Sequence, residues 1–344
     1  MKFKKPFFIA EISANHEGSL TKAYSLIRYA KKFGADAVKL QTFTPETMTL
    51  KSKQKHFKIN EGIWKNKYLW DLYTKAQTPL DWHKKLFIFG KKIGIKIFST
   101  PFDESAVDFL EKLKCPFYKV SSFEMTDLTL IKHISKTKKP IIISTGTSSL
   151  KEIELAYKTA KRNGAKKILL LYCVSNYPAK NSDFNIKNIQ LLKKKFKCEV
   201  GLSDHSNDNA IALLAAYAGA SIFEKHICLK NSKGLDSKFS IHGRQILEYK
   251  ESIEKGFLLR GKDYFFRNNS ENKSKKYRKS IWSLKNIKKG ELFSSNNIKR
   301  LRPGNGLSPI YFSKLINKKA PYNISKFSPL KKNLIKKLKI KQIN

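Results

Sequence analysis

Short apolar runs recur eight times before residue 230, and helical patterns separate most of them. The runs are Phe7–Ser13, Ala37–Phe43, Lys96–Phe102, Pro116–Ser122, Pro140–Gly146, Ile168–Ser175, Glu199–His205 and Ile222–Cys228. The helical patterns include Thr21–Phe33, Glu104–Leu113, Leu150–Arg162, Ile189–Phe196 and Asn209–Ala218. About eight parallel strands that alternate with helices are typical of a TIM (β/α)8 barrel, so we predict this α/β fold.

Several of the runs are apolar without alternation, as in Ile141–Ile143 and Leu169–Leu171. Strands that are covered by helices on both faces have this pattern. An open doubly wound sheet would need fewer strands or a glycine-rich first turn, and neither is present. The sequence therefore favours a closed barrel.

The chain of 344 residues is longer than such a barrel, which needs roughly 250 residues. We expect the barrel over residues 1–264 and a small second domain over residues 280–344. The polar run Asn268–Lys273 predicts a linker over residues 265–279.

The stretch from Thr44 to Pro79 is too long for a simple connection between a strand and a helix. We predict a helical insertion over the active-site face of the barrel. Two interpretations of its aromatic residues stay open, a lid that faces a sugar and ordinary packing. These residues are Trp64, Tyr68, Trp70 and Tyr73.

The formal net charge of +43 suggests nucleic acid or an anionic membrane surface as a partner. The lysines, however, are spread from Lys2 to Lys341 instead of forming one face or tail. A compositional drift towards lysine, as in an AT-rich genome, explains this dispersal better than a binding stripe. We therefore expect no nucleic-acid partner, although a positive field would attract a phosphorylated substrate.

The compartment is predicted from the cysteines and from the apolar segments. The four cysteines are scattered without the spacing of a disulfide or metal framework, which suits a reducing compartment. No stretch approaches the ~20 uninterrupted apolar residues that a membrane span needs. The apolar run near the N-terminus is interrupted by Glu11, so we interpret it as a core strand and expect a cytoplasmic protein without a membrane partner.

Polar side chains stand at the end of nearly every predicted strand, where TIM barrels place their active sites. Two lysines and four hydroxyl residues form a set suited to a phosphate and a carboxylate, because each anionic oxygen needs a charged or dipolar donor. Phosphoenolpyruvate carries both of these groups. The set consists of Lys39, Lys119, Thr100, Ser122, Ser144 and Ser203.

Two histidines, His205 and His226, end neighbouring predicted strands, and Glu11 and Asp236 are expected beside them. We predict that both imidazoles bind one divalent metal ion. Two imidazoles with oxygen ligands suit Mn, Zn or Fe better than Mg.

The chain resembles the sialic acid synthase family, whose members condense phosphoenolpyruvate with an amino-sugar aldehyde. The resemblance covers essentially the whole chain in the family's order. The matching stretches are Ile9–Gly18, Gly34–Thr42, Ser99–Phe102, Tyr118–Glu124, Ser144–Gly146, Gly201–His205, Glu224–His226 and Arg302–Gly306. It implies an antifreeze-like (SAF) domain over residues 280–344 and a divalent metal cofactor, Mn or Mg, with other metals left open.

The resemblance also implies a role for each site residue. Phosphoenolpyruvate would bind the six lysine and hydroxyl residues named above, and the metal would bind His205 and His226. The catalytic residues would be Glu11, Glu124, His205 and His226, and the sugar would contact Gln41, Tyr177, Asp236 and Arg302. In the family the terminal domain of one subunit closes the barrel of the other, so a domain-swapped homodimer is expected.

The sugar is suggested by the segment from Gly234 to Ser240, which contains Asp236-Ser237 where members that act on N-acetylmannosamine have Asp-His. This form resembles the members that make pseudaminic acid, so we favour a 6-deoxy-2,4-diacetamido hexose. Synthesis of N-acetylneuraminate or legionaminate stays an alternative. Two further alternatives are a lysine-rich nucleic-acid-binding protein and an aldolase with a Schiff-base lysine, Lys39 or Lys119.

Overall fold

The computed structural model describes residues 5–341, and the chain divides after Gly261 into two compact units. The predicted boundaries of the barrel, linker and small domain stay predictions. Within the described residues, no helix has the length and apolar character needed to cross a membrane.

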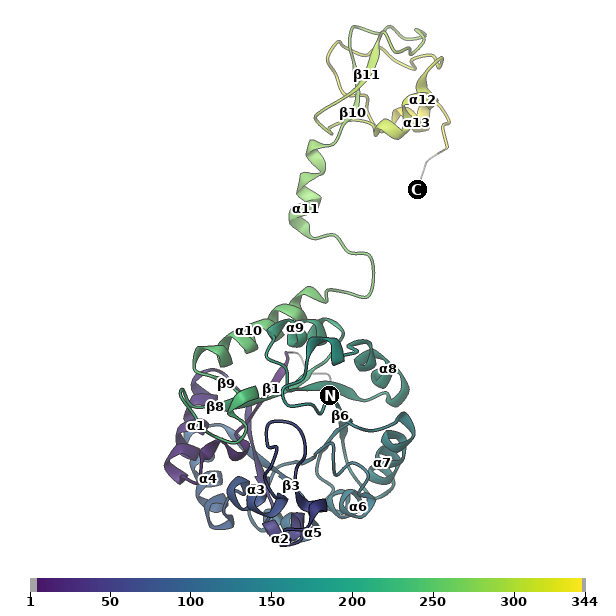
Figure 1. Ribbon diagram of the computed structural model, residues 1–344. Coiled ribbons are helices and arrows are strands. Elements are labelled where there is room, and N and C mark those ends of the chain that lie inside the picture. Colours follow the sequence, from purple (N-terminus) through teal and green to yellow (C-terminus); the bar gives the residue numbers. More distant parts are fainter. Residues whose placement is uncertain (1–4, 342–344) are drawn as a thin grey trace. The chain divides into compact units, whose positions relative to one another are not determined.

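The first unit is the predicted TIM barrel, in which eight parallel strands form a closed sheet (Figure 1). Each strand pairs with the next, and β1 also pairs with β8, which closes the ring. The strands are β1 (Phe7–Glu11), β2 (Ala37–Thr42), β3 (Lys96–Pro101), β4 (Tyr118–Val120), β5 (Ile141–Ser144), β6 (Ile168–Cys173), β7 (Glu199–Asp204) and β8 (Ile222–Cys228). A short strand, β9 (Ile241–His242), extends the pairing at the end of β8.

Helices surround the barrel because their apolar stripes cover the outer faces of the strands. They are α1 (Leu20–Lys32), α4 (Leu80–Ile93), α5 (Glu104–Lys112), α6 (Leu128–Lys136), α7 (Leu150–Arg162), α8 (Lys187–Phe196), α9 (Asn209–Tyr217) and α10 (Arg244–Leu259). Local sequence fixes several of their starts. In α7, for example, Ser149 and Glu152 form a reciprocal capping box at the N-terminus.

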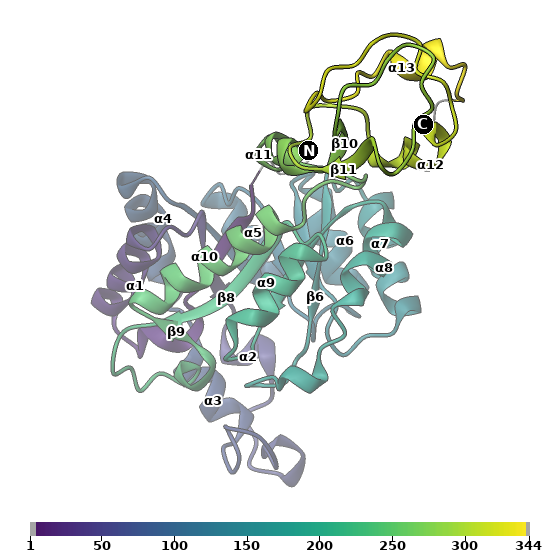
Figure 2. The same ribbon diagram turned by 90° about the horizontal axis from the view of Figure 1, so that it is seen from above.

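A buried ion pair lies outside the barrel wall, between β7, β8 and α10. Lys225 and Asp204 are paired residues of the two strands, and 3.7 Å separates Nζ from Oδ2. Both side chains are almost fully buried, and Nζ of Lys225 lies 5.7 Å from the centre of the Tyr249 ring on α10. Figure 2 shows α9 and α10 side by side over this part of the barrel.

The insertion between β2 and α4 differs in part from the prediction. It contains two helices, α2 (Pro45–Met48) and α3 (Leu69–Ala76), but its middle forms a hairpin closed by a bridge between Lys58 and Tyr68. Gly62 and Asn66 adopt left-handed backbone conformations there, with φ of 75° and 68°. These are turn residues, so a continuous helix through this segment is excluded.

The second unit has a separate hydrophobic core. An antiparallel pair, β10 (Ser280–Ser283) and β11 (Ile298–Leu301), supplies the buried residues Ile281 and Ile298. Short helices complete the unit: α11 (Asn269–Lys273), α12 (Phe312–Leu315) and α13 (Leu334–Lys337). Buried side chains from the loops, among them Phe293 and Leu307, fill the space between these elements.

Candidate active site

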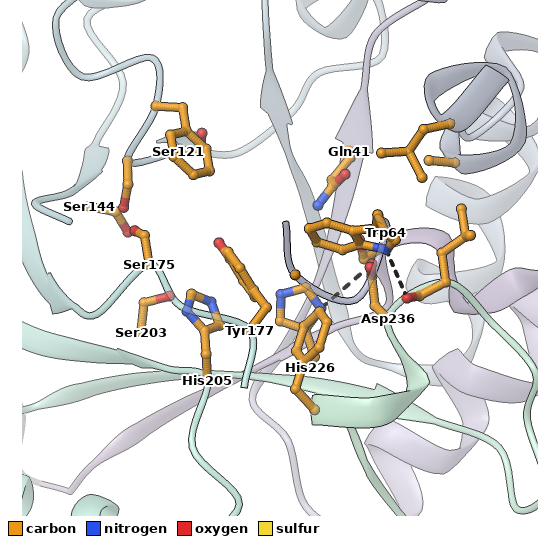
Figure 3. A pocket seen from close by; sticks show the side chains of 18 of the residues that line it. Gln41, Trp64, Ser121, Ser144, Ser175, Tyr177, Ser203, His205, His226 and Asp236 are labelled. Carbon is orange, nitrogen blue, oxygen red and sulfur yellow. Dashed lines mark hydrogen bonds and ion pairs between the residues drawn. The ribbon is translucent and has the colours of Figure 1, made fainter. Parts of the chain in front are cut away.

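A cavity of about 570 Å³ opens at the C-terminal ends of the barrel strands. Eleven of the fourteen site residues predicted from the sequence line it, as Figure 3 shows for several of them. A twelfth, Glu11, belongs to its polar floor. Those that line the cavity are Lys39, Gln41, Lys119, Ser122, Glu124, Ser144, Tyr177, Ser203, His205, His226 and Asp236.

Three predicted residues do not line the cavity. Glu11 is fully buried beneath it and pairs with Lys39. Thr100 lies behind Lys39 and accepts a hydrogen bond of 3.2 Å from its Nζ. Arg302 belongs to the second unit, and its role stays a prediction.

The floor of the cavity is a buried cluster of two lysines and two glutamates. Lys39 Nζ lies 2.7 Å from Glu11 Oε2 and 3.3 Å from Glu224 Oε1. Lys119 donates to both carboxylate oxygens of Glu224, at 3.0 and 3.1 Å. Two cations therefore stand at the barrel mouth with their positions fixed by buried carboxylates.

Glu224 is a functional candidate that we did not assign from the sequence. It links both lysines and also accepts a hydrogen bond of 3.1 Å from Ser203 Oγ. The available signal was strand alternation, because residues 224 and 226 of β8 face the same side of the sheet. A prediction that His226 points inwards thus implies the same direction for Glu224.

Burial and charge act in opposite directions on these carboxylates. Burial raises the pKa of Glu11 to about 7, and the charge of Lys39 offsets this only in part. Burial alone would also raise the pKa of Glu224, but Lys119 and Lys39 outweigh it and hold that pKa well below its usual value. Glu224 is therefore the carboxylate that stays ionised between the two lysines.

Hydroxyl groups beside the lysines are ready to donate to an anion. Ser144 Oγ is buried and has no hydrogen-bond partner within the described residues. A side chain on Gly146 would approach Ser175 Oγ to 2.2 Å and Ser122 Oγ to 2.7 Å, so only glycine fits against these hydroxyls. An anion at this point would accept a hydrogen bond from the unpaired hydroxyl of Ser144.

His205 and His226 lie together, as predicted, with ring centres 5.5 Å apart. Nδ1 of His205 donates to the carbonyl oxygen of Val174 at 2.9 Å, which leaves Nε2 able to bind a metal. Nδ1 of His226 is buried without a hydrogen-bond partner and lies 4.0 Å from Asp236 Oδ2. Burial and the charge of His205 lower the pKa of His226 well below its usual value, which favours the neutral ring that metals bind.

No group of three or more His, Cys, Asp or Glu side chains within residues 5–341 is arranged to hold a metal ion. The imidazoles of His205 and His226 nevertheless fit a metal whose other ligands are oxygens of substrate and water, because the buried Nδ1 of His226 has no hydrogen-bond partner among the described residues. The protein would then supply only part of the coordination shell.

The other wall of the cavity is aromatic. Tyr177 stacks against His205 with ring centres 4.3 Å apart and against Phe239 at 5.0 Å. Trp64, from the hairpin of the insertion, lies 5.7 Å from Tyr177. Trp64 and Phe239 were not among the predicted site residues, because their contact depends on how a long insertion folds back over the barrel.

The fold is that of a barrel enzyme, and its mouth brings two buried lysines next to two neighbouring imidazoles. The family model "NeuB family" matches residues 26–263, and the model "SAF domain" matches residues 278–336. The chain therefore belongs to the NeuB family, which confirms the predicted resemblance to sialic acid synthases.

Several relatives match nearly the whole chain. A pseudaminic acid synthase of Campylobacter jejuni serotype O:2 is 39% identical over 93% of this chain and 94% of its own. One from Helicobacter pylori is also 39% identical, over 94% of this chain and 96% of its own. An N,N'-diacetyllegionaminic acid synthase of the same Campylobacter strain is 38% identical over 93% of this chain and 97% of its own.

A solved structure supports the same family. The N-acetylneuraminic acid synthetase of Leptospira borgpetersenii, in complex with citrate, matches with a TM-score of 0.71 and 29% identity. The match covers 79% of this chain and 90% of that one.

Proposed function

We propose that this chain is a pseudaminic acid synthase. It condenses phosphoenolpyruvate with 2,4-diacetamido-2,4,6-trideoxy-L-altrose and water, and it releases pseudaminic acid and phosphate. The observation that carries the proposal is the pair of buried lysines, Lys39 and Lys119, beside the two imidazoles at the barrel mouth. Pseudaminic acid synthases among the similar relatives support the same sugar.

Phosphoenolpyruvate binds the cationic part of the cavity in this proposal. Lys39 and Lys119 face its anionic groups, and Ser122 and Ser144 donate hydrogen bonds to their oxygens. Ser203 does so once its hydroxyl turns from Glu224 to the substrate. Glu11 and Glu224 raise the pKa of Lys39 against the effect of burial. A lysine that is held as a cation is a poor Schiff-base nucleophile, which disfavours Lys39 in the aldolase alternative. Burial lowers the pKa of Lys119, so for that lysine the alternative is tested by borohydride trapping with pyruvate.

The sialic acid synthases of the family are generally metal-dependent. Here His205 and His226 would hold a divalent ion, for which we propose Mn or Mg. The ion would polarise the aldehyde of the open-chain sugar. The role of the two residues is to keep their ring nitrogens at the cavity surface next to Asp236.

The reaction joins carbon 3 of phosphoenolpyruvate to the aldehyde carbon of the sugar. The electron pair of the enol double bond forms the new C–C bond, which leaves carbon 2 electron-deficient. The π electrons of the aldehyde C=O bond move to its oxygen, which takes up a proton and becomes a hydroxyl group. Water adds at carbon 2 and loses a proton, and phosphate leaves by cleavage of the C–O bond. Glu124 lines the cavity and is placed to accept the proton, whereas Glu11 lies beneath the cavity and positions Lys39.

Burial raises the pKa of Glu11 to about 7. We therefore expect kcat/KM for phosphoenolpyruvate to fall as the pH decreases through this value. Below this pH Glu11 is protonated, so the carboxylate that positions Lys39 is lost; above it the carboxylate is restored. Glu11→Gln should remove this limb of the pH profile and hold kcat/KM about tenfold low throughout. Steady-state kinetics between pH 5.5 and 8.5, in steps of about half a unit, measure both profiles.

Glu124→Gln is the matched control, because Glu124 does not contact Lys39 in the structure. It should lower kcat yet retain the limb. A limb that survives in Glu11→Gln would contradict the positioning role of Glu11.

The sugar occupies the remaining part of the cavity, where Gln41, Tyr177 and Asp236 are expected to orient it. We also propose a domain-swapped homodimer in which Arg302 of the second unit contacts an N-acetyl carbonyl. Arg302→Ala should then raise KM for the sugar at least about tenfold and change KM for phosphoenolpyruvate less than about twofold.

Arg300→Ala provides the control, because Arg300 lies two positions away and stacks on Phe312. Steady-state kinetics compare the variants, and light scattering measures the mass of the assembly. Equal effects of Arg302→Ala on both substrates, or a monomeric active enzyme, would count against this arrangement.

The proposed activity is tested by phosphate release from phosphoenolpyruvate in the presence of Mn. Three sugars are offered in parallel: the L-altro sugar, its legionaminic-type counterpart and N-acetylmannosamine. We expect turnover with the L-altro sugar. The similar legionaminic acid synthase of Campylobacter makes the legionaminic-type sugar the specific alternative. Preference for that sugar would overturn the choice of sugar but retain the chemistry.

A further inference from the structure

The cavity is mostly apolar on the side formed by the insertion, although the exposed residue Glu61 also lines it there. The insertion residues that line this side include Met48, Ile59, Ile63, Trp64, Leu69 and Leu72. The lysines, serines and carboxylates lie on the strand ends at the barrel mouth. One half of the cavity thus suits anionic groups, and the other suits a ligand surface that makes no hydrogen bonds.

Trp64 is fixed at this apolar side by a hydrogen bond to the loop that follows β8. Its Nε1–H donates to the carbonyl oxygen of Leu235 at 3.1 Å, which Figure 3 shows as a dashed line. The hydrogen bond uses the only polar group of the indole. The ring therefore presents only carbon to the cavity.

Trp64 belongs to a cluster of three aromatic rings, with Tyr177 and Phe239. Its ring centre lies 5.7 Å from that of Tyr177 and 6.3 Å from that of Phe239, and the Trp64 and Phe239 rings are nearly perpendicular. None of the three belongs to the hydrophobic core of the barrel as the described residues define it. All three line the cavity, so their packing shapes the site and not the barrel interior.

The hairpin of the insertion explains how Trp64 reaches this position. Ile59 donates to the carbonyl oxygen of Lys67 at 2.9 Å, and Asn66 donates to the carbonyl oxygen of Ile59 at 2.8 Å. These bonds close the loop that carries Trp64, while α3 continues the chain towards the barrel. The loop is therefore held at both its base and its tip, where Trp64 binds Leu235.

We infer that Trp64 is a specificity residue that recognises the methyl groups of the amino sugar, above all the deoxygenated carbon 6. This inference rests on the proposed function and specifies which part of that sugar the site selects. A hydroxymethyl group at carbon 6 would bury a hydroxyl against carbon atoms without a hydrogen-bond partner. A methyl group would instead gain apolar contact with the indole.

The test compares two amino sugars that differ only at carbon 6, one with a methyl group and one with a hydroxymethyl group. Kinetics of phosphate release give kcat/KM for each. We expect the wild-type protein to prefer the 6-deoxy sugar by on the order of 10- to 200-fold, the effect of one group in an apolar pocket. Trp64→Ala should bring the ratio near one and leave KM for phosphoenolpyruvate within about twofold.

Two further variants separate the apolar surface from the fold of the insertion. Trp64→Phe keeps an aromatic face but loses the N–H donor, so it should retain most of the preference. Trp70→Ala is the matched control, since Trp70 lies on α3 of the same insertion and does not line the cavity. It should behave like the wild type.

Two results would overturn the inference and leave the proposed function standing. One is an unchanged ratio of kcat/KM for the two sugars in Trp64→Ala, and the other is an equal rise of KM for the amino sugar and for phosphoenolpyruvate. A wild-type protein that releases no phosphate with any amino sugar would overturn the proposed function. Calorimetry without phosphoenolpyruvate then decides the inference separately. Weaker binding of the 6-deoxy sugar by Trp64→Ala would support it, whereas equal binding, or none by the wild type, would overturn it.

Discussion

Lys119→Met is expected to lower kcat/KM for phosphoenolpyruvate by about 10²- to 10³-fold, the range for loss of one preorganised donor to a developing negative charge. Lys119 is fully buried, lines the cavity and is held by both oxygens of Glu224. Methionine has a similar shape, but it removes the cation that faces the substrate. Phosphate-release kinetics with varied phosphoenolpyruvate measure the effect.

The matched control is Lys225→Met. Lys225 is as buried as Lys119 and also faces a buried carboxylate, Asp204, but it lies outside the barrel wall. Loss of Lys225 removes the cation beside Asp204, and loss of Lys119 leaves Glu224 with Lys39 at 3.3 Å, so both variants should lose stability, by up to roughly 3–5 kcal/mol. Urea unfolding measures this loss, and kinetics are compared at equal folded fraction. A similar fall of kcat/KM in the two variants would show that destabilisation, not loss of the anion contact, is responsible.

His226→Ala is expected to abolish high-affinity Mn²⁺ binding and to lower phosphate release by on the order of 10²- to 10³-fold, since Lewis-acid stabilisation is worth several kcal/mol. The proposal of His226 as a ligand rests on its Nδ1, which is buried without a hydrogen-bond partner beside the His205 ring. Electron paramagnetic resonance of free Mn²⁺ measures binding without relying on activity.

His83→Ala provides the control for a buried histidine. His83 does not line the cavity, and its Nε2 lies 2.8 Å from Thr42 Oγ1. This variant should lose stability but retain Mn²⁺ affinity within about threefold. Unchanged Mn²⁺ binding in His226→Ala would refute the two-histidine site.

The barrel was predictable because strands buried on both faces leave continuous apolar runs that helical patterns separate. The strand ends were less exact. The run Pro116–Ser122 was predicted as a strand, but only Tyr118–Val120 pairs as β4. Apolar character extends beyond the hydrogen-bonded pairing, so hydrophobicity alone overestimates a short strand.

The lysines, hydroxyls and histidines of the site were predictable because strand ends meet at one mouth of a barrel. The depth of each side chain was not. Glu11 was expected at the site, yet it lies beneath the cavity, where it pairs with Lys39 and accepts a hydrogen bond from the backbone N–H of Ser13. Trp64 was missed as a site residue, since no local pattern reveals that the hairpin reaches the loop after β8.

The hydrogen bond of Trp64 ends on a main-chain carbonyl, and every amino acid at position 235 supplies that group. The side chain there can therefore drift during evolution without loosening the hairpin. Position 64 has less freedom, because tryptophan alone combines an indole N–H, which makes this hydrogen bond, with a broad carbon face. The two positions of this contact thus differ in how well they tolerate substitution. The side chain at position 235 can change to suit a new sugar while the hydrogen bond from Trp64 still holds the hairpin.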